Sequence, residues 1–334
     1  MKSFLTGATG FVGSHLVEAL LARGDHVTCL VRDQAKADRL FPTDRPEFVL
    51  GDLSERAALR RACADADFVF HLAGLTAARD RAEFLAVNEG GTRTVVDAVR
   101  EAAPGVRRLL YVSSLAAAGP TARGRPLTEE DLPHPVSAYG ASKLAGEAAA
   151  KTSGLPWTIV RPPAVYGPRD VELLRVFKLV RLGIHIVLGD GKQELSFIHV
   201  TDLVSALLRV AAEGSDGTTY FACHPETVTS REFVGEVDRA VRLSAGKQRR
   251  APGQPLTVAV PTWIARPALA TSGALAKIVG RRTLLSADKA NELLAEAWTC
   301  SPAAIERDTG WSATIPLATG LEDTATWYRQ HGWF

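Results

Sequence analysis

A tyrosine and a lysine four residues apart are the side chains in this 334-residue chain whose spacing most directly suggests acid–base chemistry. The stretch SAYGASKLAGE, residues 137–147, is expected to open a helix, so Tyr139 and Lys143 would project from one face of it. A phenol, with an ordinary pKa of about 10, transfers protons poorly at neutral pH unless a nearby ammonium group favours its phenolate form. Such a pair is common by chance, but this one follows an apolar run that ends in Ser113 and Ser114.

A glycine-rich turn, TGATGFVGSHL at residues 6–16, suggests a second kind of chemistry. It follows a short apolar run and precedes helical apolar spacing. Gly7 permits a tight turn, Gly10 lets the backbone approach a ligand, and Gly13 lets the helix pack closely on the strand. The free N–H groups at the start of the helix suit a pyrophosphate. The alternative is a tight strand-to-helix turn without a ligand.

Five apolar runs alternate with helical patterns over the first half of the chain. The runs cover residues 3–5, 26–32, 48–53, 67–74 and 108–114, and helices are expected over 11–21, 55–63, 81–103 and 137–153. Strands rich in Val, Leu and Phe that alternate with helices indicate an α/β fold, with a Rossmann-type doubly wound parallel sheet covered on both faces. Ligands bind at the carboxyl ends of such strands, so we expect the informative side chains to gather there.

The end of the second run, Val31-Arg32-Asp33, bears on which dinucleotide would bind. A carboxylate at this tip would hold a ribose 2′-hydroxyl, whereas a guanidinium suits a 2′-phosphate. We favour NADP(H), with Arg32 as the principal contact and Lys36 or Arg39 as helpers. NAD(H) stays open, with Asp33 on the ribose and Arg32 stacked on the adenine.

Asp52 ends the third run and is placed to accept a hydrogen bond from an adenine amino group. Alternatively it lies in a turn and caps the following helix.

Bulk properties exclude several classes of partner. The net charge is +2 and no basic stripe with interleaved aromatic residues suggests nucleic acid. Cys29, Cys63, Cys223 and Cys300 are scattered without a C-x-x-C pair, so buried thiols in a reducing compartment are expected and metal binding is not. No leader and no apolar run of membrane-spanning length is present, which predicts a cytoplasmic protein without a membrane span.

Eight motifs, in order, resemble the extended short-chain dehydrogenase/reductase family of the NAD-dependent epimerase/dehydratase superfamily. They are TGATGFVG at 6–13, GDL at 51–53, HLAG at 71–74, VNEGGT at 87–92, YVSS at 111–114, YGASK at 139–143, RPPAVYGP at 161–168 and FIHVTDL at 197–203. The resemblance implies a sheet of about seven strands and a smaller C-terminal substrate-binding lobe. We assign residues 1–165, with contributions from about 195–222, to the dinucleotide-binding domain, and 166–194 and 223–334 to the lobe.

The resemblance also implies the roles of individual residues. Ser114, Tyr139 and Lys143 would form the catalytic set, with Asn88 as a supporting residue. The residues expected to bind the dinucleotide are Gly7, Thr9, Gly10, Phe11, Val12, Gly13, Arg32, Asp52, Leu53, Leu72, Ala73, Gly74, Ser113, Tyr139, Lys143, Pro162 and Val165. Lys143 and a positively charged nicotinamide would lower the pKa of Tyr139, and Ser114 would hold the substrate oxygen. Ser113 is expected to be structural rather than catalytic.

Two subfamilies fit less well. Members that dehydrate nucleotide sugars carry a sequence like Thr-Asp-Glu at the positions that match Ser114, Leu115 and Ala116 of this chain. The acidic pair for water elimination is therefore missing here. Sugar-nucleotide epimerases carry an arginine just before the segment matching FIHV, where this chain has residues 194–196, Glu-Leu-Ser. A buried diphosphate without a cation is costly, although Arg169 or Arg175 could substitute.

The segments 165–188 and 255–285 should line the substrate pocket, because the family's specificity elements fall there. The second is apolar around Trp263 and Ile264 and suggests a pocket wall or an amphipathic lid that could contact a membrane, with a core helix as the alternative. This favours the branch with dihydroflavonol reductases and 3β-hydroxysteroid dehydrogenases. His199 and Asp202 are expected to fix a strand-to-helix corner, and the aromatic C-terminus to pack as core.

We therefore expect an oxidoreductase that uses NADP(H), or NAD(H), on a mostly apolar ketone, aldehyde or secondary alcohol. The alternatives are a nucleotide-sugar epimerase with tightly held NAD, and a non-catalytic dinucleotide sensor or assembly factor. By analogy with the family, helices near 81–103 and 137–153 would pair two copies into a homodimer.

Overall fold

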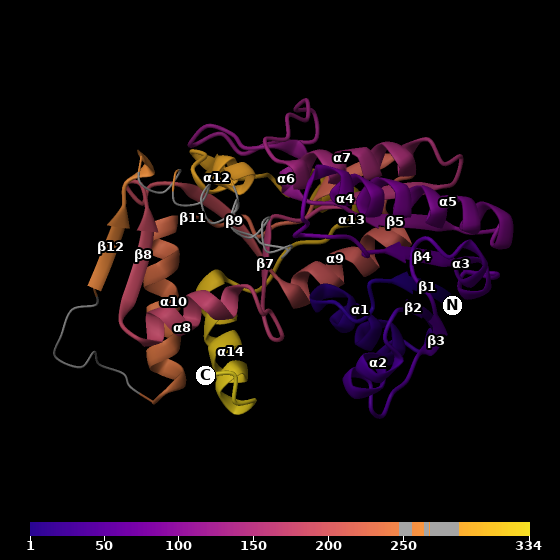
Figure 1. The fold of residues 1–334 in the computed structure, drawn as a ribbon, viewed down its shortest axis with the longest axis horizontal. Helices are drawn as coiled ribbons and strands as arrows, with labels where there is room; N and C mark the ends of the chain where they lie inside the picture. Colours follow the sequence, from indigo (N-terminus) through magenta and orange to yellow (C-terminus); the bar gives the residue numbers. More distant parts are fainter. Residues whose placement is uncertain (247–255, 264–266, 268–286) are drawn as a thin grey trace.

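The computed structural model describes residues 1–246, 256–263, 267 and 287–334, and its main feature is a parallel sheet of seven strands (Figure 1). The strands, in spatial order, are β10 (Thr218–Phe221), β6 (Trp157–Arg161), β5 (Arg108–Val112), β4 (Phe68–His71), β1 (Lys2–Thr6), β2 (His26–Val31) and β3 (Glu47–Leu50). The strand order reverses between β1 and β4, so this order places a crevice at their carboxyl ends. The predicted Rossmann-type sheet is confirmed.

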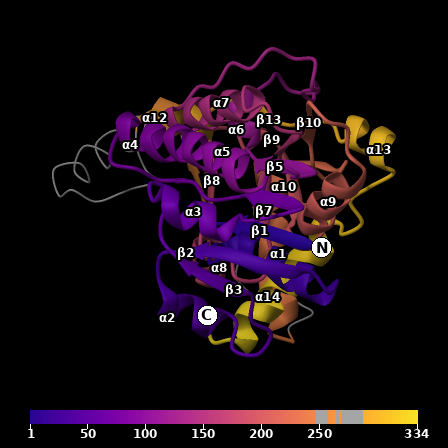
Figure 2. The same ribbon diagram turned by 90° about the vertical axis from the view of Figure 1, so that its right-hand side faces the viewer.

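Helices cover both faces of this sheet (Figures 1 and 2). On one face, α1 (Phe11–Ala22) packs with α9 (Val200–Glu213) around a core that includes Leu5, Leu16 and Leu203. On the other face, α3 (Arg56–Ala62), α5 (Gly91–Ala102) and α7 (Ala138–Lys151) pack over Leu109 and Tyr111. The short helix α2 (Gln34–Leu40) follows β2.

The helix expected over residues 81–103 is not one regular α-helix. It consists of α4 (Arg81–Leu85), a π-helical turn at Ala86–Gly90 and α5. Single π-turns inside helices insert one residue and are frequent at functional sites. Here the turn carries Asn88, which is buried.

A second lobe lies beside the C-terminal edge of the sheet (Figure 1). Its larger sheet pairs β9 (Glu194–His199) with β7 (Ala164–Tyr166), β11 (Thr227–Thr229) and β13 (Ala297–Trp298), and its smaller one pairs β8 (Ile184–Leu188) with β12 (Leu256–Val260). The helices of the remaining chain are α6 (Leu115–Ala118), α8 (Leu173–Arg181), α10 (Ser230–Ser244), α12 (Ala287–Leu293), α13 (Ala303–Thr309) and α14 (Leu317–Gln330). Thus β10, within the expected contribution of about 195–222, joins the central sheet, whereas β9 pairs in the larger sheet of the lobe.

The aromatic C-terminus packs as core, as predicted. Tyr328 is fully buried and stacks on Trp333 at 5.5 Å, while Phe177 of α8 meets the Tyr328 ring edge-on at 5.2 Å. His199 and Asp202 lie at the corner between β9 and α9, as expected. His199 caps α9, and Asp202 instead accepts hydrogen bonds from the backbone N–H groups of Thr314 and Ile315, because its carboxylate faces the C-terminal segment.

Other expectations concern burial and the segment after residue 246. All four cysteines are free and buried. None of the described helices has the length and apolar character to cross a membrane. Residues 256–260 of the proposed pocket wall form β12, whereas 264–266 and 268–285 lie outside the described residues, as does 247–255.

Candidate active site

The glycine turn between β1 and α1 has the geometry of a phosphate cradle. Gly7 has φ +82°, and a Cβ atom there would lie 2.8 Å from the Ala73 nitrogen. A Cβ on Gly13 would lie 2.1 Å from the Gly7 carbonyl oxygen, so the helix can approach the strand only with glycine at this position. Gly10 precedes α1 without a side-chain cap. The first N–H groups of α1 therefore remain available for an anion, which fits a dinucleotide pyrophosphate.

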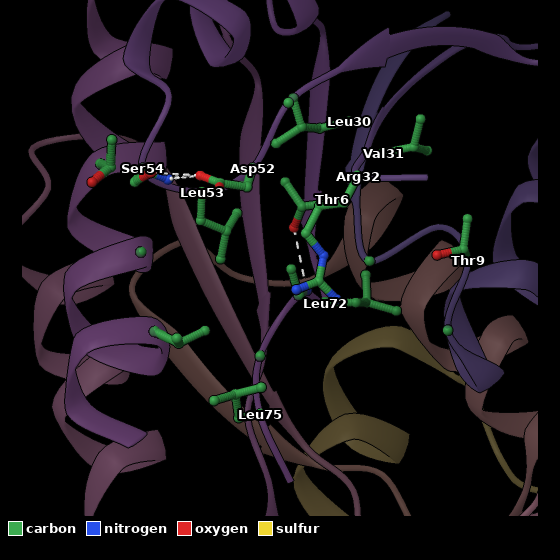
Figure 3. Close-up of a pocket in the computed structure, with 18 of the residues that line it drawn as sticks. Thr6, Thr9, Leu30, Val31, Arg32, Asp52, Leu53, Ser54, Leu72 and Leu75 are labelled. Atoms are coloured by element: carbon green, nitrogen blue, oxygen red, sulfur yellow. Dashed lines mark hydrogen bonds between the residues drawn. The ribbon is translucent and has the colours of Figure 1, made fainter. Parts of the chain in front are cut away.

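A cavity of about 600 Å³ opens at this turn and runs along the carboxyl ends of β1, β2, β3 and β4 (Figure 3). Its lining includes these predicted cofactor residues: Gly7, Thr9, Gly10, Arg32, Asp52, Leu53, Leu72, Ala73 and Gly74. The wall opposite the strands comes from the π-turn and the start of α5, where Gly91 leaves room for Leu53. The other predicted cofactor residues lie outside this lining: Phe11, Val12, Gly13, Ser113, Tyr139, Lys143, Pro162 and Val165.

Two cationic side chains, Arg32 and Lys36, line the cavity at the end of β2. Figure 3 shows the Arg32 guanidinium pointing into the cavity. Asp33 is the N-cap of α2: one of its carboxylate oxygens accepts a hydrogen bond from the Lys36 backbone N–H at 2.8 Å. Arg39 is exposed and does not belong to the lining. This end of the cavity is therefore suited to an anionic group.

Asp52 lies on the opposite wall from Thr9 in Figure 3. Its Oδ1 accepts hydrogen bonds from the backbone N–H of Ser54 at 2.7 Å and from the Ser54 hydroxyl at 2.6 Å. These bonds hold the pKa of Asp52 below its ordinary value. The carboxylate thus shapes the turn after β3 and lines the cavity as well.

Tyr139 and Ser114 meet at the carboxyl end of β5. Ser114 precedes α6 and accepts a hydrogen bond from the Ala116 N–H, while its side chain also hydrogen-bonds that of Tyr139. Burial raises the pKa of Tyr139 to about 12, the bond with Ser114 opposes this shift, and the carboxylate of Glu292 adds to it. The pKa of Tyr139 is thus raised rather than lowered, because desolvation of the phenol is the largest influence on it.

Lys143 lies one turn further along α7 and is 4% exposed. Its Nζ donates a hydrogen bond to the Val112 carbonyl oxygen at 2.7 Å and sits 4.4 Å from the centre of the Tyr111 ring. Burial lowers the pKa of Lys143 to about 8, against the influence of Glu147. A Cβ on Gly74 would lie 3.8 Å from Nζ, so the ammonium group is directed toward the end of β4, next to the cavity.

Asn88 joins the two halves of the site. Its Oδ1 accepts the Leu75 N–H at 2.7 Å, and its Nδ2 donates to the Leu75 carbonyl at 3.1 Å and to the Ser142 hydroxyl at 2.8 Å. Asn88 therefore fixes the segment after β4 against α7, the helix that carries Tyr139 and Lys143.

Ser113 points away from Tyr139. Its hydroxyl donates to Oε1 of Glu147 at 2.6 Å, and Glu147 also accepts a bidentate pair of hydrogen bonds from Arg161 at 2.8 and 2.7 Å. The Arg161 and Glu147 side chains are 3% and 0% exposed. This buried cluster supports the expected structural role of Ser113. The pattern of the sequence gave no sign of Glu147, whose partners lie 14 and 34 residues away.

A buried histidine also escaped the sequence analysis. His71 lies between two hydroxyls, with Nδ1 2.6 Å from Thr6 Oγ1 and Nε2 3.0 Å from Thr92 Oγ1. Since Thr92 donates its own proton to the Asn88 carbonyl at 2.6 Å, it must accept from His71, so Nε2 carries the proton. Burial lowers the pKa of His71 to about 3, which keeps the ring neutral.

Arg169 and Arg175, the two candidates for a diphosphate contact, are both engaged elsewhere. Arg169 donates to both carboxylate oxygens of Glu18 on α1, at 2.9 and 2.6 Å. Arg175 is exposed and pairs with Glu172. Just before the FIHV segment, Glu194 accepts a hydrogen bond from the Gly124 N–H, and Ser196 is buried.

Comparison with known proteins identifies the family, because the model of the NAD-dependent epimerase/dehydratase family matches residues 3–223. The chain belongs to this family. Ceramide reductase of Caulobacter vibrioides is 32% identical to this family member over 340 residues, which cover 98% of this chain and 95% of that protein. A 4-hydroxy-2-methyl-3-oxo-4-farnesyl-3,4-dihydroquinoline-1-oxide ketoreductase of Stigmatella aurantiaca is 33% identical over 244 residues, or 70% of this chain and 71% of that protein.

Among solved structures, the family member is similar to DesIV, a dTDP-glucose 4,6-dehydratase from Streptomyces venezuelae with NAD and TYD bound. The TM-score is 0.78 at 25% identity, and the match covers 100% of this chain and 99% of DesIV. The predicted family and fold are both confirmed.

Proposed function

We propose that this chain is an oxidoreductase that prefers NADP(H) and reduces a ketone or aldehyde, or oxidises the matching secondary alcohol, on a mostly apolar small molecule. The observation that carries the proposal is the hydrogen bond between Ser114 and Tyr139 at the carboxyl edge of the sheet, with Lys143 one turn further along the same helix. A protein that only binds dinucleotide has no need of such a set, which argues against a sensor or assembly factor.

Each of the three residues has a task in reduction. The Ser114 hydroxyl holds the substrate oxygen next to Tyr139, and the Tyr139 phenol donates its proton to that oxygen. The raised pKa of Tyr139 keeps the phenol protonated and ready to act as an acid at neutral pH. The Lys143 ammonium group stabilises the phenolate that remains. A nicotinamide dinucleotide, held at the glycine turn, would supply the hydride.

The preference for NADP(H) rests on the charge at the end of β2. Arg32 and Lys36 both line the cavity there, and Asp33 is occupied in capping α2. A 2′-phosphate would find two cations at this position, and a guanidinium binds phosphate with two parallel hydrogen bonds.

The apolar substrate is inferred from the similar proteins and from the lobe. The two similar proteins are a ceramide reductase and a ketoreductase of a farnesylated dihydroquinoline-1-oxide, and both of these compounds carry long apolar chains. We assign substrate binding to residues 166–194 and 223–334, and dinucleotide binding to 1–165 with contributions from about 195–222. A nucleotide-sugar epimerase is disfavoured, because Arg169 is committed to Glu18 and residues 194–196 bring no cation.

The test is a titration of protein stripped of bound nucleotide with NADPH and with NADH. We expect tighter binding of NADPH, and a loss of about 10- to 100-fold in R32A that NADH does not share, as for a charged hydrogen-bonded contact. R39A is the matched control, since Arg39 is an exposed arginine on the nearby helix α2 and lies outside the cavity lining. Equal affinities for the two dinucleotides in the wild type would contradict the preference.

A further inference from the structure

A carboxylate from the second lobe reaches the start of the helix that carries Tyr139. Glu292 of α12 is 8% exposed, and its Oε1 accepts a hydrogen bond from the Ser137 hydroxyl, 155 residues earlier in the chain. Ser137 is the N-cap of α7 and accepts the Gly140 N–H at 3.0 Å. Because Ser137 donates its proton to Glu292, its lone pairs are free to accept from α7. The neighbouring Asn291 donates to the Val136 carbonyl at 3.2 Å.

The helix α12 is itself tied to the lobe. The Trp298 indole donates to the Glu292 carbonyl at 2.7 Å, and Trp298 belongs to β13, which pairs with β9. The Gln193 amide donates to the carbonyls of Leu293 and Ala295 at 3.3 and 2.7 Å. Glu292 therefore connects the lobe sheet to the first turn of α7, in which Tyr139 is the second residue.

The charge of Glu292 is favourable at this position and also acts on Tyr139. A carboxylate at a helix N-terminus is stabilised by the helix dipole. Around Tyr139, the described neighbours are Ser114 before α6, Phe84 of α4 at 6.0 Å between ring centres, Tyr111 of β5, Lys143 on α7 itself and Glu292 on α12. Among these described groups, Glu292 is the carboxylate, and it raises the pKa of the phenol.

We propose that Glu292 is a positioning residue: it holds the first turn of α7, and with it Tyr139, in place against the substrate lobe. This inference rests on the proposed reductase function for its chemical consequence, but its structural part stands on the hydrogen bonds alone.

The experiment compares E292Q with the wild type by two measurements. The first is hydrogen–deuterium exchange of the peptide covering residues 136–143. We expect roughly fivefold faster exchange in E292Q, because a neutral amide accepts from Ser137 about half as strongly as a carboxylate. The second is the pH dependence of kcat/KM for NADP-dependent oxidation of the matching alcohol, in which the Tyr139 phenolate accepts the proton. Its rising limb should move to lower pH by about 0.5 unit or more, because removal of the charge makes the phenolate easier to form.

Two further variants separate the explanations. E296Q makes the same charge change at an exposed residue four positions further along and should match the wild type in both measurements. S137A removes the cap but leaves the carboxylate, so it should speed exchange without moving the pH limb. If E292Q matches the wild type in exchange and in pH profile, the inference is wrong. If no variant, the wild type included, reduces a ketone, the proposed function fails, while the exchange of E292Q and S137A still decides whether Glu292 positions α7.

Discussion

Lys143 is held in surroundings that oppose its charge. Its side chain is 4% exposed, so the ammonium group has lost most of its contact with water. In place of water it contacts the Val112 carbonyl oxygen and the face of the Tyr111 ring. Burial lowers the pKa of this residue from 10.5 to about 8. A buried ammonium costs stability, and the fold tolerates this cost where a positive charge serves the chemistry.

This arrangement predicts an unusual pH dependence of stability. Between pH 8 and 10.5 the unfolded chain still binds a proton that the folded chain has released, so the free energy of unfolding should rise with pH in this window. Urea unfolding of wild type and K143M, measured at several pH values, isolates the effect. We expect the difference in unfolding free energy, wild type minus K143M, to increase by roughly 1–3 kcal/mol from pH 7.5 to pH 10. A constant difference would contradict the lowered pKa.

Tyr139 gives the second prediction at this scale. Y139F removes the hydroxyl that bonds Ser114 and keeps the ring, which packs near Phe84. Ketone reduction should fall by at least about 100-fold, as for loss of a general acid, while the dissociation constant of NADPH stays within about threefold of the wild type. Turnover at the wild-type rate would remove Tyr139 from the proposed mechanism.

The sequence predicted the residues of this site better than it predicted their partners. Ser114 and Tyr139 were expected together, because the motifs YVSS and YGASK that contain them resemble those of the family. Glu147, His71 and Glu292 were missed, because each is an ordinary polar residue in sequence and acquires its role only from partners that are distant along the chain.

At the scale of elements, the contact between α1 and β1 depends on the absence of a side chain. A Cβ on Gly13 would lie 2.1 Å from the Gly7 carbonyl oxygen, which is backbone and cannot rotate away. We expect G13A to lower the free energy of unfolding by about 1–3 kcal/mol and to weaken NADPH binding, because α1 must shift away from the cradle. Thermal unfolding and cofactor titration measure both effects.

The matched control is G105A. A Cβ on Gly105 meets no atom within 4 Å, so this variant should change stability by less than about 0.5 kcal/mol. Equal losses in G13A and G105A would mean that the close approach of α1 to β1 does not matter for stability.

The elements expected from the periodicity were found with one informative error, whereas α2, β6 and β10 were not among them. The strands and helices of the sheet appear where the periodicity placed them, since apolar alternation reports burial directly. The helix over 81–103 was expected to be regular, yet it contains the π-turn at Ala86–Gly90. Apolar spacing does not reveal a single inserted residue, because the stripes on either side of the turn are each short.

At the scale of the whole molecule, Arg169 joins the two lobes. Arg169 lies in the loop after β7, and its guanidinium hydrogen-bonds the side chains of Ser14, His15 and Glu18. These three residues belong to α1, the helix that follows the glycine turn. The backbone of Arg169 has φ +74°, in the left-handed region that favours glycine. The strain is tolerated because the side chain is held by α1.

The strain at Arg169 predicts an order of stabilities. R169A and R169G both lose the contacts to α1, but glycine adopts the positive φ without strain. The free energy of unfolding of R169G should therefore be about 1 kcal/mol larger than that of R169A. At Arg175, inside α8, the order should be reversed by a similar amount, because glycine is the poorer helix former. Urea unfolding of the four variants tests this; R169G no more stable than R169A would refute the strain.

The Rossmann-type sheet followed from the sequence, but the join between the lobes did not. Alternating apolar runs are sufficient for a Rossmann-type sheet, and β10 completes it from 218–221. Contacts such as Arg169 to Glu18 span 151 residues, and the sequence records no trace of which arginine faces α1. The expected pocket wall over 255–285 remains a prediction where it falls outside the described residues, at 255, 264–266 and 268–285.

Because of the π-turn, the orientation of Asn88 in the site depends on the number of residues in this helix. Each residue of an α-helix turns the next by about 100°, so one residue more or fewer between Arg81 and Ala102 would rotate everything before it relative to everything after. Deleting Glu89 would restore an unbroken helix and swing Asn88 away from Leu75 and Ser142. In this helix, deletion of a single residue would therefore disturb the site more than substitution of a single residue.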